Sequence, residues 1–258
     1  MKNLKDIEMI PLYSDYMFKK VFMENPKILM NMLISVLKLD IKPELSTIRF
    51  MNTELTKSRR KEYKKTVDIL VSINDTRVVD VEINTEKYSL IRERNTFYIE
   101  KIISMGVEES TEYKDMSHYY FYQLNLNIGG TENNFKDKYF SFRDEYTNEV
   151  LTPNIKIIYK SLDYYKKIYY NKHDNVNEDV LWMLLIQSKD FDELITYAKK
   201  LIKDEDYNKF IKSVRDGSMD GFSIANWESD KMEALVRRRA EEEKRKDEIG
   251  RASCRERV

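Results

Sequence analysis

Acidic and amide side chains recur at every second position of the segment RVVDVEIN, residues 77–84. Asp80, Glu82 and Asn84 alternate with valine and isoleucine, so an extended strand would place all three on the face opposite the aliphatic side chains. The alternation predicts a strand with one polar face, and two carboxylates lie on that face.

A further carboxylate, Asp68, interrupts the aliphatic run of the preceding segment, TVDILVSI at 66–73. Asn74 and Asp75 predict a two-residue turn that joins the two segments as a hairpin. With that turn, position 68 would pair roughly across from position 81, and Asp68 would lie near Glu82 at one end of the hairpin. Two carboxylates this close in a half-buried sheet repel each other, and a divalent cation would relieve the repulsion.

Oxygen ligands of this kind favour Mg²⁺, Mn²⁺ or Ca²⁺ over zinc. The chain has only two histidines, His118 and His173, which argues against a zinc site. The same pattern also fits a strand whose acids merely keep one sheet face in solvent. Spacing alone therefore leaves a metal site and a solvated face both open, and Asp80 could either bind a second ion or keep the strand soluble.

Helices and further strands are expected around this hairpin. Residues 12–39 predict two helices, with Asn25 as N-cap and Pro26 at the first position of the second helix. Residues 48–50 predict a short strand, residues 86–105 a helix, and residues 122–128, 139–145 and 155–162 three more strands. Beyond Asp163 the pattern is helical. The order predicts an α/β core (1–162) with a helical C-terminal part (163–248).

The composition excludes several classes of protein. The 258 residues include 45 Lys and Arg and 45 Asp and Glu, and 41% are hydrophobic, which suffices for a sizeable core and argues against disorder. The first residues lack the apolar region of a signal peptide, and the longest apolar run, 180–186, is too short to span a bilayer. We therefore expect a soluble cytoplasmic protein.

The last ten residues, 249–258, resemble the translation of a sequencing adapter, and we expect the gene to be truncated near Glu248. This tail contains the only cysteine, Cys254. Disulfides, thiolate metal sites and cysteine nucleophiles are therefore not expected.

Several short segments occur in an order that is typical of a known nuclease family. They are SDYMFKKVF at 14–22, VDILV at 67–71, VVDVEIN at 78–84, RNTFY at 94–98, YQLNLNI at 122–128 and YFSFRDE at 139–145. Together they resemble the recombination-promoting nucleases, also described as transposases, of the PD-(D/E)XK superfamily, over about residues 12–160. The resemblance implies a restriction-endonuclease-like core of mixed sheet flanked by helices. It also implies a metal-dependent DNA endonuclease linked to recombination or mobile elements.

The same resemblance implies roles for single residues. Asp68 and Glu82 match the acidic metal ligands of the family, and the backbone carbonyl of Ile83 would complete their hold on Mg²⁺ or Mn²⁺. Asn84 stands where the superfamily has Lys and this family usually has Gln, and it would orient the attacking water without carrying a charge. Arg94 matches a family arginine and would contact the scissile phosphate; a salt bridge to a neighbouring acid or to a site carboxylate is an equal alternative.

Two further positions near the N-terminus match the family. Phe18 is most simply a core residue, whereas Asp15 is either an N-terminal helix charge or an acid at the margin of the site.

A strongly basic run, KSRRKEYKK at 57–65, leads into the Asp68 segment. Its position beside the predicted metal site, in a chain of zero net charge, makes it the best candidate for non-specific contacts with DNA phosphates. The alternative is a solvated face or a mobile loop. The candidate residues are Lys57, Arg59, Arg60, Lys61, Lys64 and Lys65.

Three functions remain open. The leading one is a sequence-tolerant, Mg²⁺-dependent DNA endonuclease. The second is a catalytically weak relative that binds DNA or a partner protein, because Asn84 departs from the family pattern. The third is a structural module, which would require the acids of the hairpin to point into solvent. DNA is the expected partner, no membrane is expected, and a homo-oligomer is left open.

Overall fold

The computed structural model describes residue 4 and residues 7–55, 65–84, 91–106, 112–128, 137–171 and 176–255. Its centre is a six-stranded sheet with the order β1-β4-β5-β6-β8-β7. The strands are β1 (Ile48–Phe50), β4 (Ile69–Ile73), β5 (Arg77–Asn84), β6 (Tyr120–Asn127), β7 (Asp137–Arg143) and β8 (Val150–Ser161). Neighbours β5, β6 and β8 are parallel and the other pairs antiparallel. The predicted mixed sheet is confirmed.

The strand predicted for residues 66–73 is broken at Asp68. β3 (Lys65–Thr66) pairs with β2 (Glu54–Leu55) in a separate two-stranded sheet, and β4 begins only at Ile69. The backbone N–H of Val67 donates to the carbonyl of Thr53, at 3.1 Å, so the chain leaves one sheet here before it joins the other. A continuous strand was therefore the wrong prediction, and Asp68 lies in a bend between two strands.

The turn of the hairpin also differs from the prediction by one residue. Asn74 and Asp75 take the left-handed backbone conformation, with φ of 51° and 54°, as a tight hairpin turn requires. Thr76 also belongs to the turn, because Ile73 pairs with Arg77. Ile69 consequently pairs with Val81, and this register brings position 68 opposite position 82 rather than 81.

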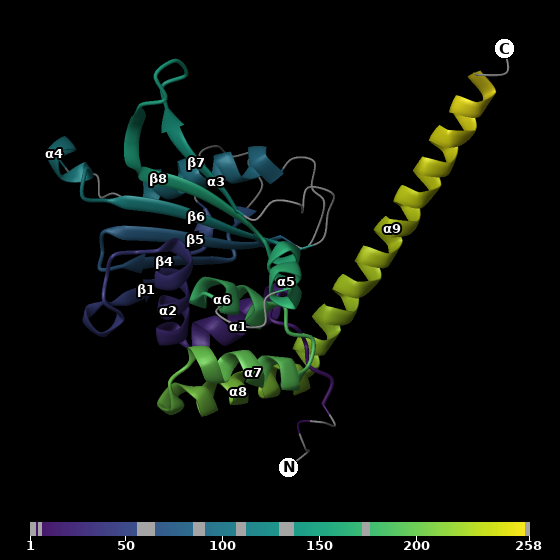
Figure 1. Ribbon diagram of the computed structural model, residues 1–258, viewed down its shortest axis with the longest axis horizontal. Helices are drawn as coiled ribbons and strands as arrows, with labels where there is room; N and C mark the ends of the chain where they lie inside the picture. The colour runs from purple at the N-terminus through teal and green to yellow at the C-terminus, as the bar shows by residue number, and fades with distance from the viewer. Residues whose placement is uncertain are drawn as a thin grey trace.

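Helices cover both faces of the sheet, as Figure 1 shows. α3 lies over one face, and α1, α2, α5 and α6 lie against the other, with α7 and α8 beyond them and α9 projecting from the body. The helices are α1 (Asp15–Glu24), α2 (Pro26–Leu37), the 3₁₀ helix η2 (Pro43–Leu45), α3 (Ile91–Gly106), α4 (Tyr113–Met116), α5 (Leu162–Asn171), α6 (Glu178–Ile186), α7 (Phe191–Leu201), α8 (Asp204–Met219) and α9 (Gly221–Arg255). This confirms a restriction-endonuclease-like arrangement of a sheet flanked by helices.

The junction of α1 and α2 is predicted correctly in position but not in its contacts. Pro26 opens α2, yet the Asn25 side chain makes no capping bond. Its Nδ2 instead donates to the carbonyl of Val21 at 2.7 Å and to Oγ of Ser213 on α8 at 3.1 Å. Because Asn25 is buried, its amide is needed for these two acceptors, and it ties α1 to the C-terminal helices.

Two hydrophobic clusters hold the layers together. The larger cluster joins one face of the sheet to α1, α2 and α5–α8, with Phe18, Phe22, Val81 and Trp182 fully buried in it. The smaller cluster packs α3 against the opposite face of the sheet. Each large apolar side chain that becomes fully buried contributes about 1.5–3 kcal/mol. The helices beyond residue 162 thus share a core with the sheet, and the division at 162/163 stays a prediction.

None of the described helices is long and apolar enough to cross a membrane.

Candidate active site

The alternating acids of β5 lie on the face of the sheet that α3 covers. Asp80, Glu82 and Asn84 are 0%, 3% and 6% exposed, and they share this face with Val78, a member of the smaller cluster. The predicted alternation is confirmed, but the solvated-face alternative is wrong for these residues, because α3 packs over them. The condition for a purely structural module, acids that point into solvent, is therefore not met.

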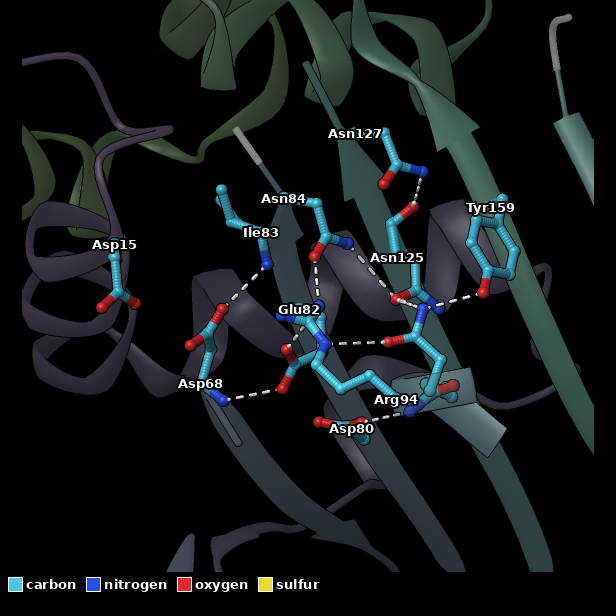
Figure 2. A network of polar contacts seen from close by, with 12 residues as sticks. Asp15, Asp68, Asp80, Glu82, Ile83, Asn84, Arg94, Asn125, Asn127 and Tyr159 are labelled. Carbon is cyan, nitrogen blue, oxygen red and sulfur yellow. Dashed lines mark hydrogen bonds and ion pairs between the residues drawn. The ribbon is translucent and has the colours of Figure 1, made fainter. Parts of the chain in front are cut away.

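Two hydrogen bonds tie Asp68 to β5, one to the side chain of Glu82 and one to the backbone of Ile83, as Figure 2 shows. The backbone N–H of Asp68 donates to Oε1 of Glu82 at 3.0 Å. The Asp68 side chain in turn accepts at Oδ2 from the backbone N–H of Ile83, at 2.9 Å. The break before β4 makes this possible, because both N–H groups lie where the β4–β5 ladder has ended. The carboxylate of Glu82, on β5, and that of Asp68, in the bend before β4, are thus positioned at one junction.

Burial and mutual repulsion make both carboxyl groups costly to ionise. Burial raises the pKa of Glu82 well above its usual value, and the charges of Asp80 and Asp68 raise it further. Burial, followed by the charge of Asp15, raises the pKa of Asp68 to about 6. Such groups gain most from a divalent cation, which removes the penalty of the charged form.

Asp80 is the most deeply buried acid of the row. Its Oδ2 accepts from Nε2 of Gln123 at 3.0 Å, while its Oδ1 and Oε1 of Gln123 are buried without a hydrogen-bond partner. Burial raises the pKa of Asp80 to about 8, so the fold favours the neutral form of this carboxyl group. Strand solubility does not explain a residue with no exposed surface, and a role as second metal ligand stays a prediction.

Arg94, on α3, contacts the other end of the site. Its guanidinium donates to Oδ1 of Asn84 and lies 3.5 Å from Oε2 of Glu82. It also stacks over the ring of Tyr98, 5.6 Å from the centroid. The alternative foreseen for Arg94, a salt bridge to a site carboxylate, is therefore present, while its contact with a phosphate stays a prediction.

A row of amide side chains beside the acids was not predicted as part of the site. Nδ2 of Asn84 donates to Oδ1 of Asn125 at 3.4 Å, and Nδ2 of Asn95 donates to the same oxygen at 2.7 Å and to the hydroxyl of Tyr159 at 2.8 Å. Asn125 and Asn95 are fully buried. The sequence signal was the alternation of Gln123, Asn125 and Asn127 in β6, which repeats the period of β5.

Lys19, on α1, is a second cation that sequence reasoning missed. Its Nζ lies 2.7 Å from Oδ1 of Asp15 and 3.0 Å from Oδ1 of Asp68. Burial lowers the pKa of this ammonium, but the charge of Asp68 and the contacts with Asp15 outweigh burial and leave it raised. The four-residue spacing of Asp15 and Lys19 was the available signal; the approach of Asp68 could not be read from it.

The remaining candidates lie partly outside the described residues. Residues 57–64 of the basic run are not among them, and Lys65 is placed only as a backbone position in β3. Among the residues that the structure does describe, no group of three or more His, Cys, Asp or Glu side chains could hold a metal ion. An ion held by Asp68 and Glu82 would therefore need further oxygen ligands from the backbone or from water.

Comparison with known proteins adds a family. A family model described as a PD-(D/E)XK nuclease family transposase matches residues 12–236. Searches of curated proteins and of solved structures give no significant match. The matched region contains the whole sheet, helices α1–α8 and the acidic pair of the hairpin.

The raised pKa of Asp80 predicts a pH-dependent stability. Its folded-state pKa of about 8 exceeds the ordinary 3.8, so between these values the folded state binds more protons, and stability falls as pH rises. Asn cannot ionise. We expect Asp80→Asn to raise the free energy of unfolding at pH 8 by at least about 1 kcal/mol, and this gain should vanish near pH 4. Urea unfolding across this pH range measures it. The exposed Asp75→Asn is the control, and a gain independent of pH would contradict the assignment.

Proposed function

The chain belongs to the PD-(D/E)XK nuclease family transposases, and we propose that it is an endonuclease that hydrolyses DNA phosphodiester bonds with a divalent metal ion held by Asp68 and Glu82. The observation that carries the proposal is the meeting of a partly buried Asp68 with a buried Glu82 at the junction of β4 and β5, where Asp68 bonds to Glu82 and to the backbone of Ile83. Membership of a transposase family supports a role in recombination or in mobile elements. Action on cellular DNA would place the protein in the cytoplasm.

The chemistry of the donor set fits Mg²⁺ or Mn²⁺. Both ions prefer oxygen ligands. Burial, and after it the charges of neighbouring acids, raise the pKa values of Asp68 and Glu82, and a cation would stabilise their charged forms. Asp68, Glu82 and the carbonyl of Ile83 would hold the ion. The chemistry that a bound metal supplies is polarisation of the phosphate and activation of a water molecule.

The neighbouring polar residues would then position the reactants. The amide nitrogen of Asn84 has two hydrogens, and its contact with Asn125 uses one, so the other could orient the attacking water. The side chain of Arg94 is 32% exposed, which allows a phosphate oxygen to reach a guanidinium already fixed by Asn84 and Tyr98. Charge-assisted contacts of this type are about twice as strong as neutral ones.

A second candidate is a catalytically weak relative that binds DNA through the same fold. The observation in its favour is that both ends of the Asn84 amide already have protein partners, Arg94 and Asn125. In that case wild-type protein would bind DNA without cutting it under any divalent metal.

Conservative changes of the acids test the proposal. Asp68→Asn and Glu82→Gln keep an acceptor for the backbone N–H groups but remove a charged ligand. We expect each to lower single-turnover nicking of supercoiled DNA in Mg²⁺ at least about 10²-fold, while thermal stability in EDTA stays equal or rises because repulsion is relieved. Asp75→Asn, an exposed acid of the same hairpin, should leave the rate unchanged. Full activity in either site variant would remove the proposed metal centre.

The role of Asn84 has its own test. Asn84→Gln should retain or raise the nicking rate, because the longer amide matches the family, whereas Asn84→Ala should lower it about 10²- to 10⁴-fold. Mn²⁺ affinity, measured by calorimetry, should change little in both. If the wild-type and Ala proteins cleave equally and above background, Asn84 takes no part in the reaction.

The basic run is tested through salt dependence. Replacing four of its residues by Ser should weaken DNA binding for all sequences and reduce the slope of log K against log salt by about 0.9 for each lost phosphate contact. The substituted residues are Arg59, Arg60, Lys64 and Lys65. A control with the same change in charge, on α7, α8 and the link between them, replaces Lys199, Lys200, Lys203 and Lys209. Equal slopes in wild type and the first variant would assign the run to solvent.

A further inference from the structure

Two positive side chains flank the acidic pair, one from each side of the sheet. Arg94 approaches Glu82 from α3, and Lys19 approaches Asp68 from α1. The two cations differ in their surroundings. The guanidinium is bonded to the amide of Asn84 and stacked on Tyr98, whereas the described contacts of the ammonium are with the carboxylates of Asp15 and Asp68.

The position of Lys19 is determined by the packing of α1. Met17, Phe18, Val21 and Phe22 are fully buried in the larger core cluster, which fixes the rotation of the helix. Lys19 therefore lies on the margin of the helix, with 31% of its side chain exposed. A cation in this place is held by the fold and can still meet a ligand from solvent.

Asp68 is oriented so that its outer oxygen faces this ammonium. Oδ2 accepts from the backbone N–H of Ile83, and Oδ1 lies 3.0 Å from Nζ of Lys19. Asp15, one turn earlier on α1, lies 2.7 Å from the same ammonium and has a side chain that is 57% exposed. The ammonium of a partly exposed side chain therefore lies beside the acid that the proposed function makes a metal ligand.

A phosphodiester that is attacked by water gains negative charge, and fixed cations stabilise that charge. In the β5 strand, the side chain two residues beyond Glu82 is the neutral Asn84, which can form hydrogen bonds but supplies no charge. A cation on another element can supply positive charge if its side chain reaches the junction of β4 and β5. The ammonium of Lys19 reaches this junction, because it lies 3.0 Å from Oδ1 of Asp68.

We propose that Lys19 is a catalytic residue, whose ammonium contacts the scissile phosphate beside Asp68 and stabilises the charge that develops during hydrolysis. The proposal rests on the nuclease function proposed above. In the step, the oxygen of one water bonds to phosphorus and the bond from phosphorus to the leaving sugar oxygen breaks. The attacking water releases a proton to solvent and the leaving oxygen takes one from solvent. Lys19 keeps its protons throughout.

Lys20 provides a matched control. It is the next residue on α1, its Nζ lies 2.9 Å from Oε1 of Glu24 in an i,i+4 pair, and its side chain is 26% exposed. Like Lys19, Lys20 lies on α1, forms an ion pair with an acid four residues away and is about as exposed. Its ion pair is with Glu24 and not with Asp68 or Glu82. Lys20→Gln should leave cleavage and metal binding as in wild type.

The experiment compares wild type, Lys19→Gln, Lys19→Arg and Lys20→Gln in two measurements: single-turnover nicking of supercoiled DNA in Mg²⁺, and Mn²⁺ affinity by calorimetry without DNA. We expect Lys19→Gln to lower the rate at least about 10²-fold. Mn²⁺ affinity should rise severalfold, because a positive charge next to a metal ligand is removed. Lys19→Arg should retain more of the rate than Lys19→Gln, since its charge is kept. Thermal unfolding checks that each variant is folded.

A merely structural role for Lys19 gives a different pattern. If Lys19 only held Asp68 in place, Lys19→Gln would weaken Mn²⁺ binding and cleavage together, and this result would overturn the proposal. A rate in Lys19→Gln within threefold of wild type would also overturn it, and so would equal losses in the Gln and Arg variants. When wild type cleaves DNA, these results refute only the role of Lys19. When wild type neither cleaves DNA nor binds Mn²⁺, the proposed nuclease function fails, and this inference fails with it.

Discussion

The burial of several carboxyl groups against one another is the constraint on which the site depends. Asp80 and Glu82 have almost no exposed surface, and burial together with mutual repulsion raises the pKa of both and of Asp68. An uncompensated buried charge costs several kcal/mol, so the fold must supply partners. It does so with backbone N–H groups at a strand break, with Arg94 and Lys19, and with the amide of Gln123. The pKa values nevertheless stay raised, and a bound cation would lower the remaining cost of ionising these groups.

The helices outside the sheet are part of this compensation. α3 covers the acidic residues of β5 and also carries Arg94, which lies 3.5 Å from Glu82. The same helix therefore buries these carboxyl groups and supplies a positive charge that stabilises their ionised form. α1 carries Lys19, and it packs closely against α8. A side chain at Gly217 would place its Cβ 2.8 Å from Sδ of Met17, and Asn25 reaches Ser213. The close approach of these two helices gives the C-terminal part a role in the geometry of the site, because a shift of α1 would move the ammonium away from Asp68.

The parallel pairing of β5, β6 and β8 explains the amide row. Carboxyl ends of parallel strands meet at one edge, and here they carry Asn84, Asn127 and Ser161. Asn125 pairs with Glu82 in the ladder, so its amide lies beside the acid and can accept from Asn84 and Asn95. These hydrogen bonds restrict the orientation of the amide groups that make them. The site is thereby preorganised around a residue, Asn84, that has no charge of its own.

The sequence alone determined those features that depend on neighbours along the chain. The period-two alternation in 77–84 placed Asp80, Glu82 and Asn84 on one face, Asn74 and Asp75 marked the turn, and Pro26 marked the start of α2. The hairpin spacing predicted that Asp68 lies near Glu82, and the family motifs then implied that both are metal ligands. Only the tertiary structure decided the break at Asp68, the three-residue turn, the burial of the acids beneath α3, and the meeting of Lys19 with Asp68 and of Asn95 with Asn125. The burial of the acids and the contacts of Lys19 and Asn95 join residues far apart in the chain, and they depend on which helix packs on which sheet face. Local periodicity contains no information about that choice, because the free energy that decides it comes from burying the whole core at once.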